Sequence, residues 1–340
     1  MSTTAEQIIA DLKQKKYAPV YFLQGEEPYF IDQVADYIEE HALQPSERSF
    51  NQTICYGKDS DINKILANAR KFPMMAERNV VIVKEAQEIP DLEKEAGTKQ
   101  LTAYLEKPVP STVLVFCYKH KKLDKRKSIA TTLEKKTVFL VSEKIKEYKL
   151  AEWIEGFCKS KSIKIAPPAA ALIAEYLGND LGRISNELDK VLINLKEGQT
   201  IDESIVQKYI GISKEYNLFE LQKAIGDKQI DKAYQIVFYF ESNPKSVATI
   251  QLISSLYGYF TKVFMMHSVG QADDKTLSVT LGVSPYAIRD YKTAARNYPP
   301  QKMFQIFDAL RSADLHSKGI EVSAVSDGEI MKELIFRIMN

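Results

Sequence analysis

The chain of 340 residues carries 46 Lys and Arg against 45 Asp and Glu, so its formal net charge is only +1. Proteins that wrap nucleic acid alone are usually far more basic, which leaves only a local or shared nucleic-acid contact. The three cysteines and four histidines lack metal-site spacing, and no apolar run has the length of a membrane span. The first residues also lack the apolar core of a signal peptide. We therefore expect a cytoplasmic protein without metal, cofactor or membrane contact, with two or three domains.

The first 142 residues alternate between strand-like and helix-like patterns. Runs that are apolar on both faces are typical of buried parallel strands. Between them, Ile62, Ile65 and Leu66 have the spacing of one helix face. The strand-like runs, of which the second is the weakest, are 20–23, 52–56, 80–83, 113–116 and 138–141. This alternation predicts an α/β domain with a parallel sheet and helices on both faces, an architecture of the nucleotide-binding type.

No strand pattern returns after about residue 148, and the next segment resembles a small helical domain. One helix carries Trp153 and ends near residue 161, and Pro167-Pro168 begin a second. Asp180 is placed to start a third, and a short fourth follows Asp202. These signals predict an all-α domain over residues 143–212, a size at which one core is viable.

Residues 213–340 show longer amphipathic helices. Pro285, Pro299-Pro300 and Gly319 separate them from one another. The apolar face of the segment 246–267 is too wide for a lone surface helix. We expect other helices, from this chain or from neighbouring subunits, to cover that face.

The turn after the first strand-like run is poorly suited to bind ATP. Phosphate loops are glycine-rich and end in Lys-Ser or Lys-Thr, so that amides and a cation hold the phosphates. Here the turn Gln24-Gly25-Glu26-Glu27-Pro28 has one glycine, no lysine and two carboxylates. Where ATPases of this class place Asp-Glu, the chain has Lys84-Glu85. We predict a frame that does not hydrolyse ATP, in which the turn simply caps a helix on the surface.

Several segments, taken in order, resemble the delta subunit of the bacterial DNA polymerase III clamp loader. They are 19–27, 72–81, 177–188, 218–221 and 314–319. The resemblance implies an AAA+-like α/β domain over 1–142 that carries a clamp-binding tip. It also implies a helical lid domain over 143–212 and a helical collar over 213–340 for oligomerisation.

The function that this resemblance implies is non-catalytic. The subunit would bind the ring-shaped sliding clamp, the beta subunit, and help to open it for loading on primed DNA during replication. Other loader subunits, tau/gamma and delta-prime, would join it through the collar, and siblings would hydrolyse ATP. The chain would thus belong to a DNA-directed DNA polymerase, a nucleotidyltransferase, without an activity of its own.

By position, the resemblance assigns the clamp-binding tip to Phe72, Pro73, Met74 and Met75. Unbranched, polarizable methionines suit a wedge that adapts to an apolar pocket. Leucine or phenylalanine is more usual at this pair in the family, so Met-Met is a departure. We expect a helix ending near residue 71, stopped by Pro73, to present the tip. The pattern alone also fits methionines that fill the core.

A basic run after the fourth strand-like segment provides candidate DNA contacts. Its cations are Lys119, Lys121, Lys122, Lys125, Arg126 and Lys127. A solvated helix start is the alternative interpretation. For the whole chain, three other functions remain open: an ATP-dependent AAA+ loader or sibling loader subunit, an enzyme on a parallel α/β sheet, and a helical scaffold.

Overall fold

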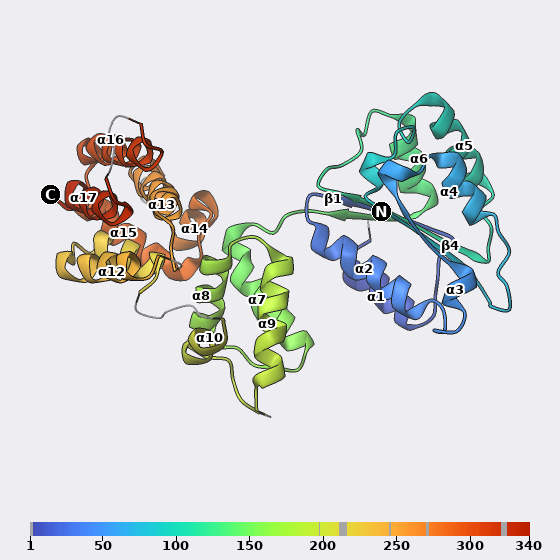
Figure 1. The fold of residues 1–340 in the computed structure, drawn as a ribbon, viewed down its shortest axis with the longest axis horizontal. Helices are drawn as coiled ribbons and strands as arrows, with labels where there is room; N and C mark the ends of the chain where they lie inside the picture. The colour runs from blue at the N-terminus through green and yellow to red at the C-terminus, as the bar shows by residue number, and fades with distance from the viewer. Residues whose placement is uncertain (1–2, 197, 211–215, 245, 270–271, 321–324) are drawn as a thin grey trace. The chain divides into compact units, whose positions relative to one another are not determined.

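The computed structural model describes residues 3–196, 198–210, 216–244, 246–269, 272–320 and 325–340 (Figure 1). The chain divides into two compact units, Met1–Lys144 and Ile145–Asn340. The predicted division between a second and a third domain, at residue 212, lies outside the described residues. Among the described residues, every helix is too short or too polar to cross a lipid bilayer.

The first unit is built on a parallel sheet of five strands in the order β2-β3-β4-β1-β5. The strands are β1 (Val20–Gly25), β2 (Gln52–Tyr56), β3 (Asn79–Lys84), β4 (Thr112–Lys119) and β5 (Val138–Ser142). All five strand-like runs of the sequence are therefore confirmed as strands. The weakest run forms β2, which lies at an edge of the sheet and buries less of its surface than the inner strands.

Helices cover both faces of this sheet, as predicted (Figure 1). The helices α1 (Ala5–Lys13) and α2 (Pro28–His41) pack on one face, and α4 (Ile62–Ala69), α5 (Glu95–Glu106) and α6 (Ser128–Lys136) on the other. Successive strand residues point to opposite faces. Phe22 and Leu23 of β1 accordingly belong to different cores. Two-sided burial explains why the central strands are apolar throughout.

Shorter helices complete the first unit, and the second unit is helical. The first unit also contains α3 (Arg48–Asn51), η1 (Gly57–Asp59) and η2 (Ala86–Glu88). The second contains α7 (Glu147–Ser160), α8 (Pro167–Leu177), α9 (Leu181–Asn194), α10 (Glu203–Ile210), α11 (Leu218–Gly226), α12 (Ile230–Ser242), α13 (Thr249–Val269), α14 (Asp274–Leu281), η3 (Pro285–Ala287), α15 (Ile288–Asn297), α16 (Pro300–Ser317) and α17 (Asp327–Met339). Asp180 caps α9 as predicted, because its carboxylate accepts a hydrogen bond from the Arg183 amide at 2.9 Å.

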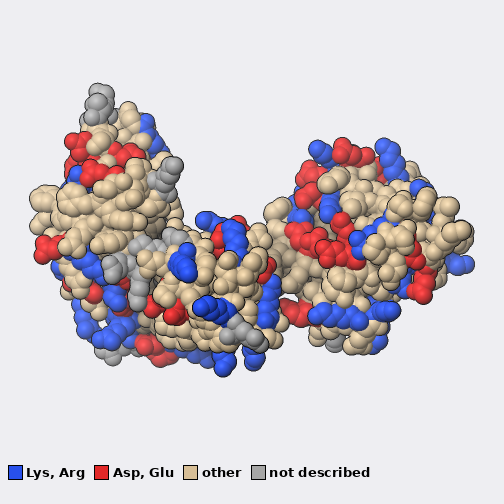
Figure 2. Space-filling model, turned by 60° about the horizontal axis from the view of Figure 1, so that its bottom comes forward, with Lys and Arg blue, Asp and Glu red and all other residues tan. Residues whose placement is uncertain are grey.

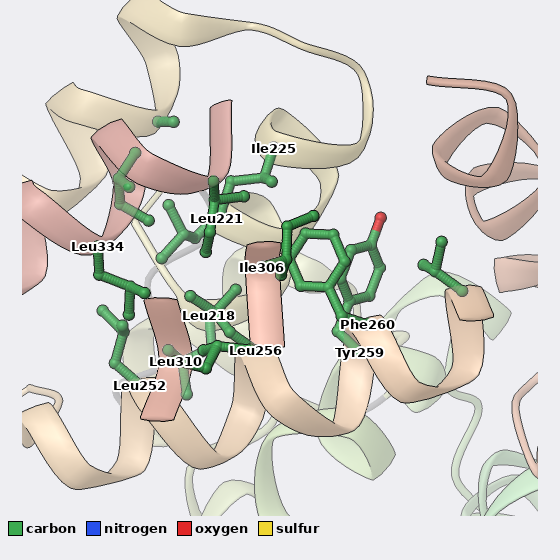
Figure 3. Packing of buried hydrophobic residues seen from close by; sticks show 14 of the residues in the cluster. Leu218, Leu221, Ile225, Leu252, Leu256, Tyr259, Phe260, Ile306, Leu310 and Leu334 are labelled. Carbon is green, nitrogen blue, oxygen red and sulfur yellow. The ribbon is translucent and has the colours of Figure 1, made fainter. Parts of the chain in front are cut away.

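The helices α11 to α17 share one apolar core (Figure 3). The broad apolar face of α13 supplies Leu256 and Phe260, which meet Ile306 and Leu310 of α16 and Leu334 of α17 in this core. Much of that face is therefore covered by helices of this chain. Other α13 side chains, discussed below, remain exposed.

Candidate functional site

An exposed apolar loop, residues 70–78, joins α4 to β3. Phe72 is 83% exposed, Met74 62% and Met75 102%. Large apolar side chains that project together into solvent are typical of a surface that binds a partner. These values exclude the alternative that the methionines fill the core. Pro73, the fourth predicted tip residue, is half-buried between them.

The first end of the loop is fixed to the sheet by side chains that cap α4. The Asn79 amide donates to the carbonyl of Asn68 at 2.9 Å. The Thr112 hydroxyl donates to the carbonyl of Ala69 at 2.8 Å. The last carbonyls of a helix need such partners. The helix ends at Ala69, within two residues of the predicted end. That Pro73 stops it stays a prediction, consistent with proline having no amide hydrogen to donate to the Ala69 carbonyl four residues before it.

Contacts with the first unit also fix the second end of the loop. The Arg78 guanidinium lies 4.3 Å from the centre of the Tyr17 ring, within cation–π range. Ala76 is partly buried and packs against the core beneath α1 and α2. Between the two anchored ends, Met75 has a φ of 53°, a left-handed conformation that is uncommon outside glycine.

Asn51, at the end of α3, contacts the middle of this loop. Its side-chain oxygen accepts a hydrogen bond from the Met74 amide at 2.6 Å. Its side-chain nitrogen donates to the Met74 carbonyl at 2.9 Å. Sequence reasoning missed Asn51, because no local pattern pairs residues that lie 23 positions apart.

The turn between β1 and α2 has an arrangement unlike a phosphate loop. The Glu27 carboxylate accepts a hydrogen bond from the Tyr29 amide at 3.0 Å, so it takes a place that a phosphate would use at this helix start. The Ser142 hydroxyl donates to the Glu27 carbonyl at 2.7 Å. The helix cap is confirmed. Glu26 is exposed but Gly25 and Glu27 are buried, so the expected surface turn lies only partly at the surface.

Lysines pair with carboxylates at this same edge of the sheet. Lys84 lies 3.0 Å from Glu39. Lys119 lies 2.6 Å from Asp32 and 3.6 Å from Glu85. Burial by itself lowers the pKa of Lys119, but the hydrogen bond and charge of Asp32 outweigh it and raise the pKa. Lys119 is thus held charged inside a network of ion pairs.

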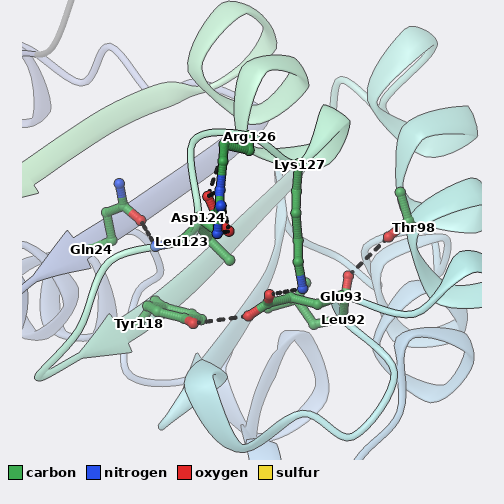
Figure 4. Close-up of polar contacts among 9 residues, drawn as sticks. All are labelled: Gln24, Leu92, Glu93, Thr98, Tyr118, Leu123, Asp124, Arg126 and Lys127. Carbon is green, nitrogen blue, oxygen red and sulfur yellow. Dashed lines mark hydrogen bonds and ion pairs between the residues drawn. The ribbon is translucent and has the colours of Figure 1, made fainter.

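Most cations of the predicted DNA-contacting run have an acidic partner, and Figure 4 draws the pairs of Arg126 and Lys127. The pairs are Lys119–Asp32 at 2.6 Å, Lys122–Glu143 at 2.9 Å, Arg126–Asp124 at 2.7 Å and Lys127–Glu93 at 2.5 Å. Lys121 lies 5.8 Å from the centre of the Tyr118 ring, and Lys125 is exposed. Basic and acidic side chains are also interspersed on the face that Figure 2 shows. DNA contact by this run stays a prediction.

The polar network around Glu93 fixes part of this run. Glu93 accepts hydrogen bonds from the Tyr118 hydroxyl at 3.1 Å and from Lys127 at 2.5 Å. The bond from Lys127 lowers the pKa of Glu93, against the opposing effect of burial. Nearby, the Gln24 side chain accepts a hydrogen bond from the Leu123 amide at 2.9 Å (Figure 4).

Within the described ranges, no group of His, Cys, Asp and Glu side chains is arranged to hold a metal ion.

Residues 21–143, which contain both the exposed loop and the basic run, match the family model of the DNA polymerase III delta subunit. The chain is 24% identical over 330 residues to DNA polymerase III subunit delta of Bacillus subtilis, covering 95% of this chain and 93% of that protein. It is 22% identical over 227 residues to a probable DNA polymerase III subunit delta of Mycoplasma genitalium, covering 67% and 73%.

Among solved structures, the DNA clamp loader delta protein of Bacillus subtilis matches with a TM-score of 0.66 and 20% identity, over 98% of this chain and 99% of that one. At that identity, the likeness shows a shared fold: a parallel α/β sheet followed by helices. Together with the sequence matches, it shows that this chain is similar over nearly its whole length to the DNA polymerase III delta subunit.

Proposed function

We propose that this chain binds the sliding clamp through residues 72–75 and helps to open it, so that the clamp can be loaded on primed DNA. The observation that carries the proposal is the exposed trio Phe72, Met74 and Met75 on a loop anchored at both ends. An anchored loop loses little conformational freedom when it binds, so more of the apolar contact energy is retained as affinity. Apolar anchors of this kind dominate many protein interfaces.

Ring opening needs only a difference in affinity. A subunit that binds the open clamp more tightly than the closed clamp shifts the equilibrium by the ratio of the two affinities. The loop would seat in an apolar pocket whose shape depends on the state of the ring. Motion of the sibling subunits, driven by their ATP hydrolysis, would expose or hide the loop.

The chain itself would contribute no ATPase activity. Glu27 accepts the Tyr29 amide at the start of α2, and Lys84 is paired with Glu39 where a magnesium-ordering aspartate would stand. A triphosphate placed there would meet carboxylates instead of amide donors. The chain would thus act as a non-catalytic part of a DNA-directed DNA polymerase holoenzyme.

An exposed aromatic surface on the second unit supports contact with other loader subunits, tau/gamma and delta-prime. Tyr257 and Phe264 of α13 are 57% and 38% exposed, and Phe304 of α16 is 73% exposed. Phe264 lies within ring-contact distance of Phe304 and Phe307, with centroids 6.5 Å and 6.2 Å apart. Aromatic clusters of this kind are enriched at interfaces. We propose that they form part of the collar.

The test is a titration of fluorescently labelled sliding clamp with the wild-type chain, with and without ATP. We expect saturable binding that ATP leaves unchanged, and no binding of a fluorescent ATP analogue to the isolated chain. Binding that requires ATP, together with analogue binding, would support an ATP-dependent loader instead. No clamp binding under either condition would refute the proposed role.

DNA contact within the assembled loader is proposed for Lys121 and Lys125, the two cations of the basic run for which the described residues show no ion pair within 4.0 Å. Lys121→Glu with Lys125→Glu should reduce the slope of log K against log salt for loader–DNA binding by about 1 to 2, because each phosphate contact contributes about 0.9. Lys275→Glu, exposed on α14, is the control. An unchanged slope would leave the run as solvated surface.

A further inference from the structure

We propose that Asn51 is a positioning residue for the exposed loop, and that it acts by holding the main chain of Met74 so that Met74 and Met75 project toward the clamp. This inference rests on the proposed function above for its final step. Its first step, that Asn51 orders the loop, concerns the free chain alone.

The Asn51 side chain uses its whole amide group for this purpose. It is only 2% exposed. Its oxygen accepts from the Met74 amide at 2.6 Å, and its nitrogen donates to the Met74 carbonyl at 2.9 Å. The second hydrogen of that nitrogen goes to the Glu47 carbonyl at 3.0 Å. Asn51 therefore bonds the donor and the acceptor of one loop residue, as a neighbouring strand does.

The position of Asn51 makes it a rigid support. Asn51 directly precedes β2, whose first residue, Gln52, pairs with Val80 of β3. The loop leads into that same strand β3. The two hydrogen bonds thus connect the loop to the start of β2, and the chain itself connects it to the start of the paired strand β3. A group with such support moves little on its own.

The loop needs this support because its conformation is not intrinsically favoured. Met75 adopts a left-handed conformation, with a φ of 53°, that its own side chain disfavours. Met75 is also fully exposed, so no packing of its side chain within the chain offsets that preference. The hydrogen bonds from Asn51 fix the main chain at Met74, directly before Met75.

Side-chain chemistry explains why asparagine fits here. Aspartate has the same shape and can still accept from the Met74 amide. It has no hydrogen to donate, however, and would place its charge against the carbonyls of Met74 and Glu47. Asn51→Asp should therefore release the loop without leaving a cavity, whereas Asn51→Ala removes all three hydrogen bonds and buried volume.

The experiment combines amide hydrogen exchange of the free chain with clamp affinity, for Asn51→Asp and Asn51→Ala. We expect exchange at residues 74–76 to accelerate about tenfold or more, with exchange in β3 and β4 unchanged. Clamp affinity should fall about tenfold, because binding must then order one or two loop residues. Asn217→Ala removes another buried asparagine, the cap of α11 in the second unit, and serves as the control. It should leave loop exchange and clamp affinity unchanged.

Three results would overturn the inference. One is unchanged loop exchange in Asn51→Asp. Another is faster exchange in the loop with clamp affinity within twofold of wild type. The third is exchange that rises equally in β3 and β4, since that indicates general destabilisation. If the wild type does not bind the clamp, the proposed function fails, but the exchange data still decide whether Asn51 orders the loop.

Discussion

Truncation of the two methionines should weaken clamp binding strongly while leaving the fold intact. Fully burying a methionine side chain is worth about 1.5–3 kcal/mol. Met75 is fully exposed in the free chain and Met74 is 62% exposed. Nearly all of the Met75 side-chain surface and more than half of the Met74 side-chain surface can therefore be buried on binding. Allowing for the Cβ atom that alanine keeps, Met74→Ala with Met75→Ala should cost roughly 2–4 kcal/mol, or roughly 30- to 1000-fold in Kd.

The assay is a titration of labelled clamp at one fixed salt concentration, without nucleotide. Ile193→Ala is the matched control, because Ile193 is also a large exposed apolar side chain, 84% exposed on α9. Both variants should unfold in urea within about 0.5 kcal/mol of wild type, since neither loses core packing. The reasoning is refuted if the double variant binds within threefold of wild type, or if the control loses as much affinity.

Three further predictions test the local physics of the fold. Gly25→Ala should destabilise the chain by about 3 kcal/mol or more in urea, because φ is +146° and a Cβ would lie 1.8 Å from a backbone oxygen. Gly156→Ala, which meets open space in a helix, should be neutral or stabilising by about 0.5–1 kcal/mol; equal effects would contradict this contrast. Lys127 lowers the pKa of Glu93 below its ordinary 4.5, so the stability Glu93 contributes is full above that pH and is lost as pH falls through the lowered pKa. Glu93→Gln should therefore flatten the fall of the urea midpoint below pH 4.5, and an unchanged acid profile would argue against the pair. Burial raises the pKa of the Cys117 thiol to about 12, so thiol reagents at pH 8 should label it only at the rate of global unfolding; fast labelling of the folded chain would contradict its burial.

The sheet could be predicted from the sequence because its inner strands are buried on both faces. That burial makes runs such as Val80–Val83 apolar at every position, a pattern that few other structures produce. The start of α9 could be predicted equally well, since Asp180 accepts a hydrogen bond from an amide only three residues away. Signals of this kind are local in the chain, and the structure confirms them.

The geometry of the exposed loop could not be predicted in the same way. Phe72, Met74 and Met75 have the composition of a core segment, and only the family resemblance indicated that they face a partner. The contacts that fix the loop join residues far apart in the sequence: Thr112 caps a carbonyl 43 positions away, and Asn51 reaches across 23. Such pairs depend on which strands become neighbours, and the hydrophobic periodicity of the sequence does not indicate the order of the strands.

Ion pairing in the basic run could not be predicted from the sequence for the same reason. Beside other lysines, Lys119 and Lys122 have the sequence pattern of unpaired surface cations. Their partners Asp32 and Glu143 come from elements that only the sheet order brings near. A charge run in a sequence therefore overstates the positive charge that the folded surface presents.

The most direct measurement is photo-crosslinking from position 75, with a photoreactive amino acid in place of Met75, to the sliding clamp without nucleotide. We predict a single major crosslink to an apolar pocket of the clamp, competed away by unlabelled wild-type chain. The same probe at Ile193 should give none. Efficient crosslinking from Ile193 with none from position 75, under conditions where the chain binds the clamp, would contradict the assignment of residues 72–75 as the clamp-binding surface.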